Sequence, residues 1–181
     1  MSPLTGPRGQ PRPVILTSMS LTIDPATPDD VPLVLTFIRE LAEYEELSDR
    51  VVVTEADLQR WMFGERRVAE AVIARQDGAP VGFALFFPVF STFLGRPGIY
   101  LEDLFVREPA RGRGTGRALV TYLARLAVGR GWGRVEWAVL DWNTAAIGFY
   151  RRLGAEMLDD WRICRLAGAA LDRLGRDTIN P

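Results

Sequence analysis

Three glycines alternate with arginine and threonine in the middle of the sequence, in the run Arg111-Gly-Arg-Gly-Thr-Gly-Arg117. The run follows an apolar stretch, 99–106, that predicts a β-strand, and it precedes apolar residues at helical spacing in 118–128. Glycine lets backbone N–H groups converge on one point without a side chain in the way. The start of the helix adds unpaired N–H groups and the positive end of its dipole. A loop of this kind predicts a phosphate-binding site.

Two other interpretations of the glycine run are weaker. An Arg/Gly run is also typical of flexible linkers and of nucleic-acid-binding tails, but an apolar strand and an amphipathic helix flank this one. The phosphate loop of nucleotide hydrolases ends in Gly-Lys-Ser/Thr, whereas this run continues Gly116-Arg117-Ala118. The sequence therefore favours a phosphate loop of another class.

Carboxylates form the second group of residues that could do chemistry. Glu102 and Asp103 are neighbours within the predicted strand 99–106, among apolar residues, and adjacent strand residues face opposite ways. Burying an unpaired carboxylate is costly, so one or both should line a polar cavity or pair with an arginine. Further acids stand in the run Glu43-Tyr-Glu-Glu46, at the end of a predicted helix where the dipole disfavours negative charge. The run 43–46 is either a solvated acidic turn or part of a site.

Composition limits the chemistry further. The 181-residue chain contains no His, which excludes a Ser-His-Asp triad, a His-based zinc site and a His-Cys nucleophile pair. All 22 basic residues are Arg, and the net charge of −1 gives no overall field for nucleic acid or an anionic membrane. No apolar run is long enough to cross a bilayer. The single Cys164 excludes an internal disulfide and favours a reducing compartment, so we predict a cytoplasmic protein with this thiol buried and inert.

The elements that must position these residues follow from periodicity and capping signals. We predict a Pro/Gly-rich disordered leader at 1–18, one domain at 19–176 and a polar tail at 177–181. Thr27 and Thr54 are predicted helix N-caps, and Asp77-Gly78 is a predicted hairpin turn. The predicted strands are 21–25, 68–75, 81–89, 99–106 and 134–140, and 91–98 is a predicted loop. The predicted later helices are 145–153 and 169–174. A closing hairpin is predicted to pair 155–158 with 161–166.

This order of elements, with Arg111-x-x-Gly114-x-Gly116 after a strand, resembles the GNAT acyl-CoA N-acyltransferases, whose loop motif reads Gln/Arg-x-x-Gly-x-Gly/Ala. The similarity is closer to the diamine (spermidine/spermine) and thialysine N-acetyltransferase branch. The matching pieces span about residues 20 to 168: Pro25-Ala-Thr27, Glu40-Leu-Ala42, Tyr44-Glu45, Thr54-Glu55, Tyr100-Leu-Glu-Asp103, Phe105-Val106, Trp142-Asn143, Phe149-Tyr-Arg151, Gly154-Ala155 and Trp161-Arg162. The resemblance implies a single α/β (α+β) GNAT-type domain with a mixed central sheet of about six to seven strands, flanked by helices and splayed at the centre where acetyl-CoA binds.

The resemblance also implies an acetyl-CoA-dependent enzyme without a metal. It would transfer the acetyl group to a primary amine of a small cationic acceptor (a polyamine, a diamine or a lysine-like amino acid) by direct attack in a ternary complex. A homodimer is implied, and neither nucleic acid nor a membrane is expected as a partner. An acyl-CoA-binding sensor without transfer and a protein or peptide N-acetyltransferase remain open as alternatives.

Residue roles are carried over by position. Tyr150 would protonate the thiolate leaving group, and Glu102 would accept the amine's proton, through water or directly, because the chain has no His. The implied cofactor-binding residues are Leu104, Phe105, Val106, Arg111, Gly112, Arg113, Gly114, Thr115, Gly116, Arg117, Asn143 and Tyr150. The implied acceptor-site residues are Tyr44, Glu45, Glu102 and Trp161.

Overall fold

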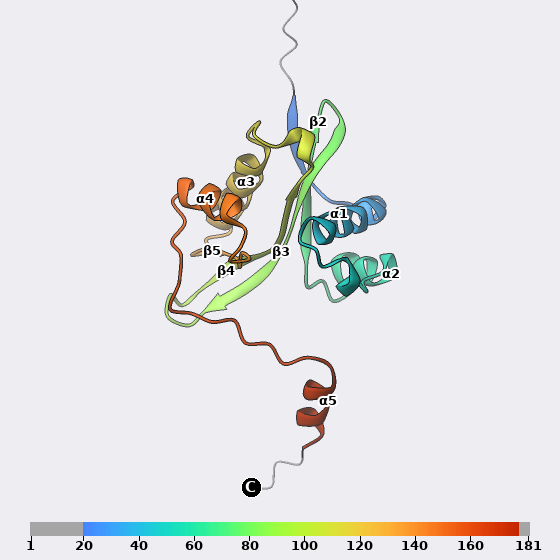
Figure 1. The fold of residues 1–181 in the computed structure, drawn as a ribbon, viewed down its shortest axis with the longest axis vertical. Helices are drawn as coiled ribbons and strands as arrows, with labels where there is room; N and C mark the ends of the chain where they lie inside the picture. Colours follow the sequence, from blue (N-terminus) through green and yellow to red (C-terminus); the bar gives the residue numbers. More distant parts are fainter. Residues whose placement is uncertain (1–19, 178–181) are drawn as a thin grey trace, which may run out of the picture. The chain divides into compact units, whose positions relative to one another are not determined.

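The computed structural model describes residues 20–177, so the predicted leader 1–18 and the last residues of the tail lie outside the described part (Figure 1). The described residues fall into two compact units, residues 20–138 and residues 139–177. The first unit contains the sheet, the glycine loop and the acidic residues singled out above. The second contains Asn143, Tyr150 and Trp161.

A five-stranded mixed sheet forms the centre of the first unit, in the order β1-β2-β3-β4-β5. The first four strands are antiparallel neighbours, and β5 runs parallel to β4. The predicted mixed central sheet is confirmed, with fewer strands than the six to seven predicted. The strands are β1 (Leu21–Pro25), β2 (Glu70–Gln76), β3 (Ala79–Ser91), β4 (Arg96–Val106) and β5 (Val135–Glu136).

The helices begin where capping signals stand in the sequence. Asp30 accepts a hydrogen bond from the backbone N–H of Thr27 at 2.9 Å, and Asp57 accepts one from that of Thr54 at 3.0 Å. Both predicted N-caps are therefore confirmed. The helices of this unit are α1 (Val31–Tyr44), α2 (Glu55–Leu58) and α3 (Thr115–Gly129), with 3-10 turns at Pro28–Asp30, Ser48–Arg50 and Glu108–Ala110 and a π-helical turn at Gln59–Phe63.

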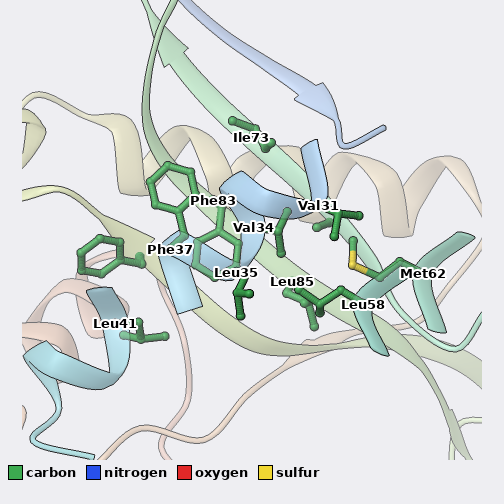
Figure 2. Close-up of a cluster of buried hydrophobic side chains, with 12 residues drawn as sticks. Val31, Val34, Leu35, Phe37, Leu41, Leu58, Met62, Ile73, Phe83 and Leu85 are labelled. Atoms are coloured by element: carbon green, nitrogen blue, oxygen red, sulfur yellow. The ribbon is translucent and has the colours of Figure 1, made fainter. Parts of the chain in front are cut away.

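Helices cover both faces of the sheet, with α1 and α2 on one face and α3 on the other (Figure 1). Side chains from α1, α2, β2 and β3 meet in the first core cluster, which Figure 2 shows in close-up. Phe37 of α1 stacks on Phe83 of β3 with ring centroids 5.2 Å apart. Alternate residues of the same strands, Val72 and Ala84 among them, pack under α3 on the opposite face.

A β-bulge interrupts the pairing of β3 with β4 beside the predicted acidic pair. Leu85 lies opposite Asp103, but its neighbour Phe86 lies opposite Leu101, so Glu102 is an extra residue in β4. Leu101 consequently packs in the cluster under α3, whereas Phe105 packs in the cluster under α1. The bulge thus turns Asp103 toward the face that α1 covers.

One edge of β4 is open over half its length. The short β5 pairs only with Ile99 and Tyr100, so within the first unit the stretch 101–106 has a strand neighbour only on the β3 side. The predicted strand 134–140 was therefore too long. Such an edge presents backbone N–H and C=O groups to any extended chain that can lie along it.

The hairpin of β3 and β4 is longer than predicted. Its strands reach Ser91 and resume at Arg96, so the predicted loop 91–98 is a tight turn with Phe93 95% exposed at its tip. Residues 82–86 of β3 form a continuous buried run, whereas 87–90, beyond the end of β2, alternate between half-buried and exposed.

The second unit contains α4 (Thr144–Arg152) and α5 (Gly168–Arg176). The predicted closing hairpin is wrong: the described residues between these helices form no strand. Trp161 and Ile163 are 73% and 72% exposed, and Cys164, predicted to be buried, is exposed as well. A run of alternating apolar residues forms a stable strand only where a second strand can hydrogen-bond to it, and no described strand pairs with 155–166. Among residues 20–177, no helix combines the length and the apolarity needed to span a membrane.

Candidate active site

The glycine loop joins the end of β4 to the start of α3. Gly112 and Gly114 have φ angles of 73° and 90°, a region that suits glycine and brings successive N–H groups to one side. Helix α3 begins at Thr115, three residues before the predicted start, so the last part of the glycine run is its first turn. Thr115 is 2% exposed and anchors that turn in the core.

The space in front of α3 is open and electropositive, which is the property a phosphate site requires. A Cβ atom added at Gly112 or Gly114 would meet no atom within 4 Å. The N–H groups of the first helical turn have no intrahelical acceptor, and the helix dipole adds partial positive charge. Arg113 and Arg117, both within the glycine run, are exposed. The residues present therefore fit the pyrophosphate of a CoA-like cofactor.

The open edge of β4 leads directly to this loop. Leu104, Phe105 and Val106 follow the bulge and end the strand. The carbonyl oxygen of Val106 accepts a hydrogen bond from Nε of Arg111 at 2.8 Å. A pantetheine arm laid along 104–106 would continue the sheet in the gap that β5 leaves.

An acidic cluster lies beside the bulge. Burial, together with the negative charges of Glu102 and Glu45, raises the pKa of Asp103 from its ordinary value of 3.8 to about 7. Burial also raises the pKa of Glu45, which follows the last residue of α1. Within the described residues, none of the three forms an ion pair, so the structural ion pair left open above is excluded there.

The structure separates the two neighbouring carboxylates. Glu102, predicted to accept the proton, is exposed at the bulge, whereas Asp103 is partly buried beneath α1. A desolvated carboxyl with a pKa near neutrality is the better proton acceptor at neutral pH. Asp103 was singled out in the sequence beside Glu102, but only Glu102 was given a catalytic role, and strict alternation gives no sign of the extra residue that separates them in β4.

The acidic end of α1 carries backbone strain. Glu46 has a φ angle of 58°, in the left-handed region that glycine normally occupies after a helix. The N–H of Leu47 donates to the carbonyl oxygen of Ala42 at 2.8 Å, which closes the helix in this conformation. The strained turn fixes the direction in which the chain leaves the acidic cluster.

Glu46→Gly should therefore stabilise the protein, by about 0.5 to 1 kcal/mol, because glycine adopts this φ angle without a Cβ clash. Urea unfolding measures the change. The control Arg39→Gly, at an exposed position within α1, should lose about 1 kcal/mol. A loss of stability in Glu46→Gly would show that the turn is not strained.

In the second unit, Asn143 and Tyr150 both lie at α4. Asn143 is its N-cap, and its Oδ1 accepts a hydrogen bond from the N–H of Ala146 at 3.0 Å, which leaves the side-chain amide to donate elsewhere. Tyr150 is buried, with its ring 5.1 Å from that of Phe149. Trp161 belongs to the exposed stretch that follows.

The structure thus brings Tyr44, Glu45, Glu102 and the glycine loop together in one unit, with the motif Arg111-x-x-Gly114-x-Gly116 at the opening of α3. The sequence profile of the acetyltransferase (GNAT) family matches residues 36–155, two thirds of the chain. The chain belongs to the GNAT acetyltransferase family. This GNAT protein is therefore an enzyme, as predicted, and its family uses acetyl-CoA as acyl donor.

Two curated relatives of this GNAT acetyltransferase cover most of its length. L-ornithine N5-acetyltransferase of Arabidopsis thaliana is 33% identical, over 85% of this chain and 87% of that protein. Thialysine N-epsilon-acetyltransferase of Sus scrofa is 37% identical, over 86% and 97%. Among solved structures, an integron cassette protein from the mobile metagenome of V. cholerae is similar with a TM-score of 0.74 and 28% identity, over 88% of this chain and 100% of that one.

Proposed function

We propose that the protein transfers the acetyl group of acetyl-CoA to a primary amine of a small cationic acceptor: a polyamine, a diamine or a lysine-like amino acid. The observation that carries the proposal is the arrangement on β4, where a carboxyl with a pKa of about 7 stands on the strand that leads into the phosphate loop. The names of the two curated relatives, which act on ornithine and thialysine, support an acceptor with an alkyl amine.

The chain's own residues would hold the donor at three places. Backbone N–H groups of the loop 111–117 would bind the pyrophosphate, and the open edge at 104–106 would pair with the pantetheine arm. Asn143 would donate to the same arm. When bound, acetyl-CoA supplies a thioester carbonyl that an uncharged amine can attack.

The amine must lose a proton before it can attack, because an alkyl ammonium has a pKa of about 10.4. We assign proton acceptance to the pair Glu102 and Asp103, with Asp103 as the base and Glu102 as the exposed charge that draws the cation in. Tyr150 would return a proton to the thiolate, since a phenol with a pKa of about 10 can protonate a thiolate of pKa about 8.5.

The acceptor site would be bordered by Tyr44, Glu45, Glu102 and Trp161. Carboxylates attract a small polycation, and aromatic rings bind its alkyl stem and ammonium groups by cation–π contact. An acceptor with two charged ends would make more of these contacts than an acceptor with a single amine.

The direct test is release of free CoA thiol from acetyl-CoA with a panel of acceptors: spermidine, putrescine, ornithine, lysine, thialysine, an aminoglycoside and an amino-terminal peptide. We expect release with the small di- and polyamines and lysine-like amino acids. Release with the peptide alone would favour a protein N-acetyltransferase. CoA binding by calorimetry with no release from any amine would favour an acyl-CoA sensor and contradict the proposal.

Tyr150→Phe should lower kcat at least about tenfold, because the leaving thiolate loses its proton donor. CoA affinity should stay nearly unchanged, since the ring remains in its buried position. Tyr122→Phe is the matched control, at a partly buried tyrosine of α3, and should leave the rate unaltered. An unaffected rate in Tyr150→Phe would remove that residue from the acid role.

The homodimer and the cytoplasmic location stay predictions. Exposed apolar side chains in the second unit (Leu158, Trp161, Ile163, Leu166, Leu171 and Leu174) support self-association. Light scattering across a concentration series tests the dimer.

A further inference from the structure

Arg111 opens the glycine loop, but its side chain is engaged elsewhere. Its Nε donates to the carbonyl oxygen of Val106 at 2.8 Å. Its guanidinium carbon lies 4.6 Å from the ring centroid of Tyr44 and 5.7 Å from that of Phe105. One side chain thus joins the loop, the end of β4 and the last residue of α1.

This connection reaches the acidic cluster. Tyr44 directly precedes Glu45, and the negative charge of Glu45 acts on Asp103 of β4. The position of Tyr44 and Glu45 over β4 therefore depends on where Arg111 holds the helix end. Arginine suits this role, because its flat guanidinium can stack on a ring and donate from Nε at the same time, which a lysine ammonium cannot do.

We propose that Arg111 is a positioning residue for the amine acceptor, which couples the cofactor loop to the Tyr44–Glu45 end of α1 through its contacts with Tyr44 and Val106. This inference rests on the proposed function. It differs from a role in binding phosphate through the guanidinium, which would require the group to leave the Tyr44 ring.

Removing the Arg111 side chain should not unfold the protein, since a second connection joins α1 to the end of β4. Arg107 donates to both carboxylate oxygens of Glu40, at 2.8 and 2.7 Å, and its guanidinium carbon lies 4.7 Å from the Phe37 ring centroid. That pair holds α1 in place one helical turn before Tyr44. Arg111→Gln therefore loosens only the end of the helix.

The experiment compares Arg111→Gln and Arg111→Lys with Arg60→Gln. Arg60 is a matched arginine, 4.8 Å from the Trp61 ring centroid and away from the loop. Both Arg111 variants should raise KM for the amine about tenfold, from the loss of the stacking contact and the hydrogen bond. Both should leave kcat and the Kd for CoA within about twofold, and Arg60→Gln should change none of the three constants.

A double-variant series tests whether the effect passes through the ring. In a Tyr44→Phe background, which retains an aromatic ring, Arg111→Gln should keep its full effect on the amine KM. In a Tyr44→Leu background it should add nothing further. A rise in the Kd for CoA with an unchanged amine KM would assign the guanidinium to phosphate and overturn the inference.

A readout without turnover separates this inference from the proposed function. Hydrogen exchange at the amides of Glu45 and Leu47, which bond to Leu41 and Ala42, should become several-fold faster in Arg111→Gln and stay unchanged in Arg60→Gln. Unchanged exchange in Arg111→Gln overturns the inference. If the wild-type protein releases no thiol with any amine, that result contradicts the proposed function instead.

Discussion

Asp103→Asn should lower kcat/KM for amine acetylation by about a hundredfold or more, because it removes a proton acceptor whose pKa lies near the working pH. In the wild-type protein, kcat/KM should rise as the pH increases through about 7, where Asp103 loses its proton. In the variant, kcat/KM should not show this rise, which is the acidic limb of the pH–rate profile. Thiol release with spermidine or ornithine, measured from pH 5.5 to 9, provides the test.

Glu102→Gln decides between the two neighbouring carboxylates. The negative charge of Glu102 helps to raise the pKa of Asp103, so its removal should lower that pKa and move the limb to lower pH. If Glu102 were the base, the limb would vanish in Glu102→Gln and persist in Asp103→Asn. Glu65→Gln, at an exposed carboxylate elsewhere in the first unit, should leave the profile unchanged.

The same Asp103→Asn variant should be more stable than the wild type at pH 8, by on the order of 2 kcal/mol. The folded-state pKa of Asp103 is raised from 3.8 to about 7, so between these values the folded protein holds a proton that the unfolded chain has released. The free energy of unfolding therefore falls as the pH rises through this window. Urea unfolding should show the gain at pH 8 and little of it near pH 4; an equal gain at both would contradict the assignment.

Gly114→Ala should weaken CoA binding by about thirtyfold or more. At a φ of 90° an L side chain is strained, so the loop must either bear that strain or turn its N–H groups away from the pyrophosphate. The added methyl group would also project into the open space in front of α3, where no protein atom lies within 4 Å. Calorimetry with CoA measures the loss.

Gly131→Ala is the matched control for Gly114→Ala. Gly131 has a φ of 69°, has equally open surroundings and follows the opposite end of α3. Both variants should lose about 1 kcal/mol of stability from backbone strain, but only Gly114→Ala should lose CoA affinity. Equal affinities in the two variants would mean that the cofactor does not sit at the opening of α3.

Features that depend on neighbouring residues could be predicted from the sequence. Thr27 and Thr54 each begin a helix because a carboxylate three residues later completes the cap. The Asp77-Gly78 turn and the glycine loop followed from conformations that few other residues adopt. These signals placed the glycine loop correctly between a strand and a helix, apart from the early start of α3 at Thr115.

Features that depend on distant pairing could not be predicted in the same way. The stretch 161–166 alternates like a strand, but no described strand pairs with it, and β5 ends at Glu136 although apolar alternation continues. The bulge at Glu102 arises from the register between β3 and β4, which adjacent residues do not encode. The sequence pattern marked Glu102 and Asp103 alike, and only the structure shows that Asp103 is the more buried of the two.

The open edge of β4 also bears on how the protein behaves at high concentration. Unpaired strand backbone that can take up a pantetheine arm is equally a template for a strand from another molecule, and nothing in its chemistry distinguishes the two. Within the first unit, the bulge and the carboxylates of Glu102 and Asp103 protect the start of this edge, but 104–106 has no charge, proline or bulge of its own. A cofactor arm bound along 104–106 would therefore compete with a strand from another molecule for the same backbone groups.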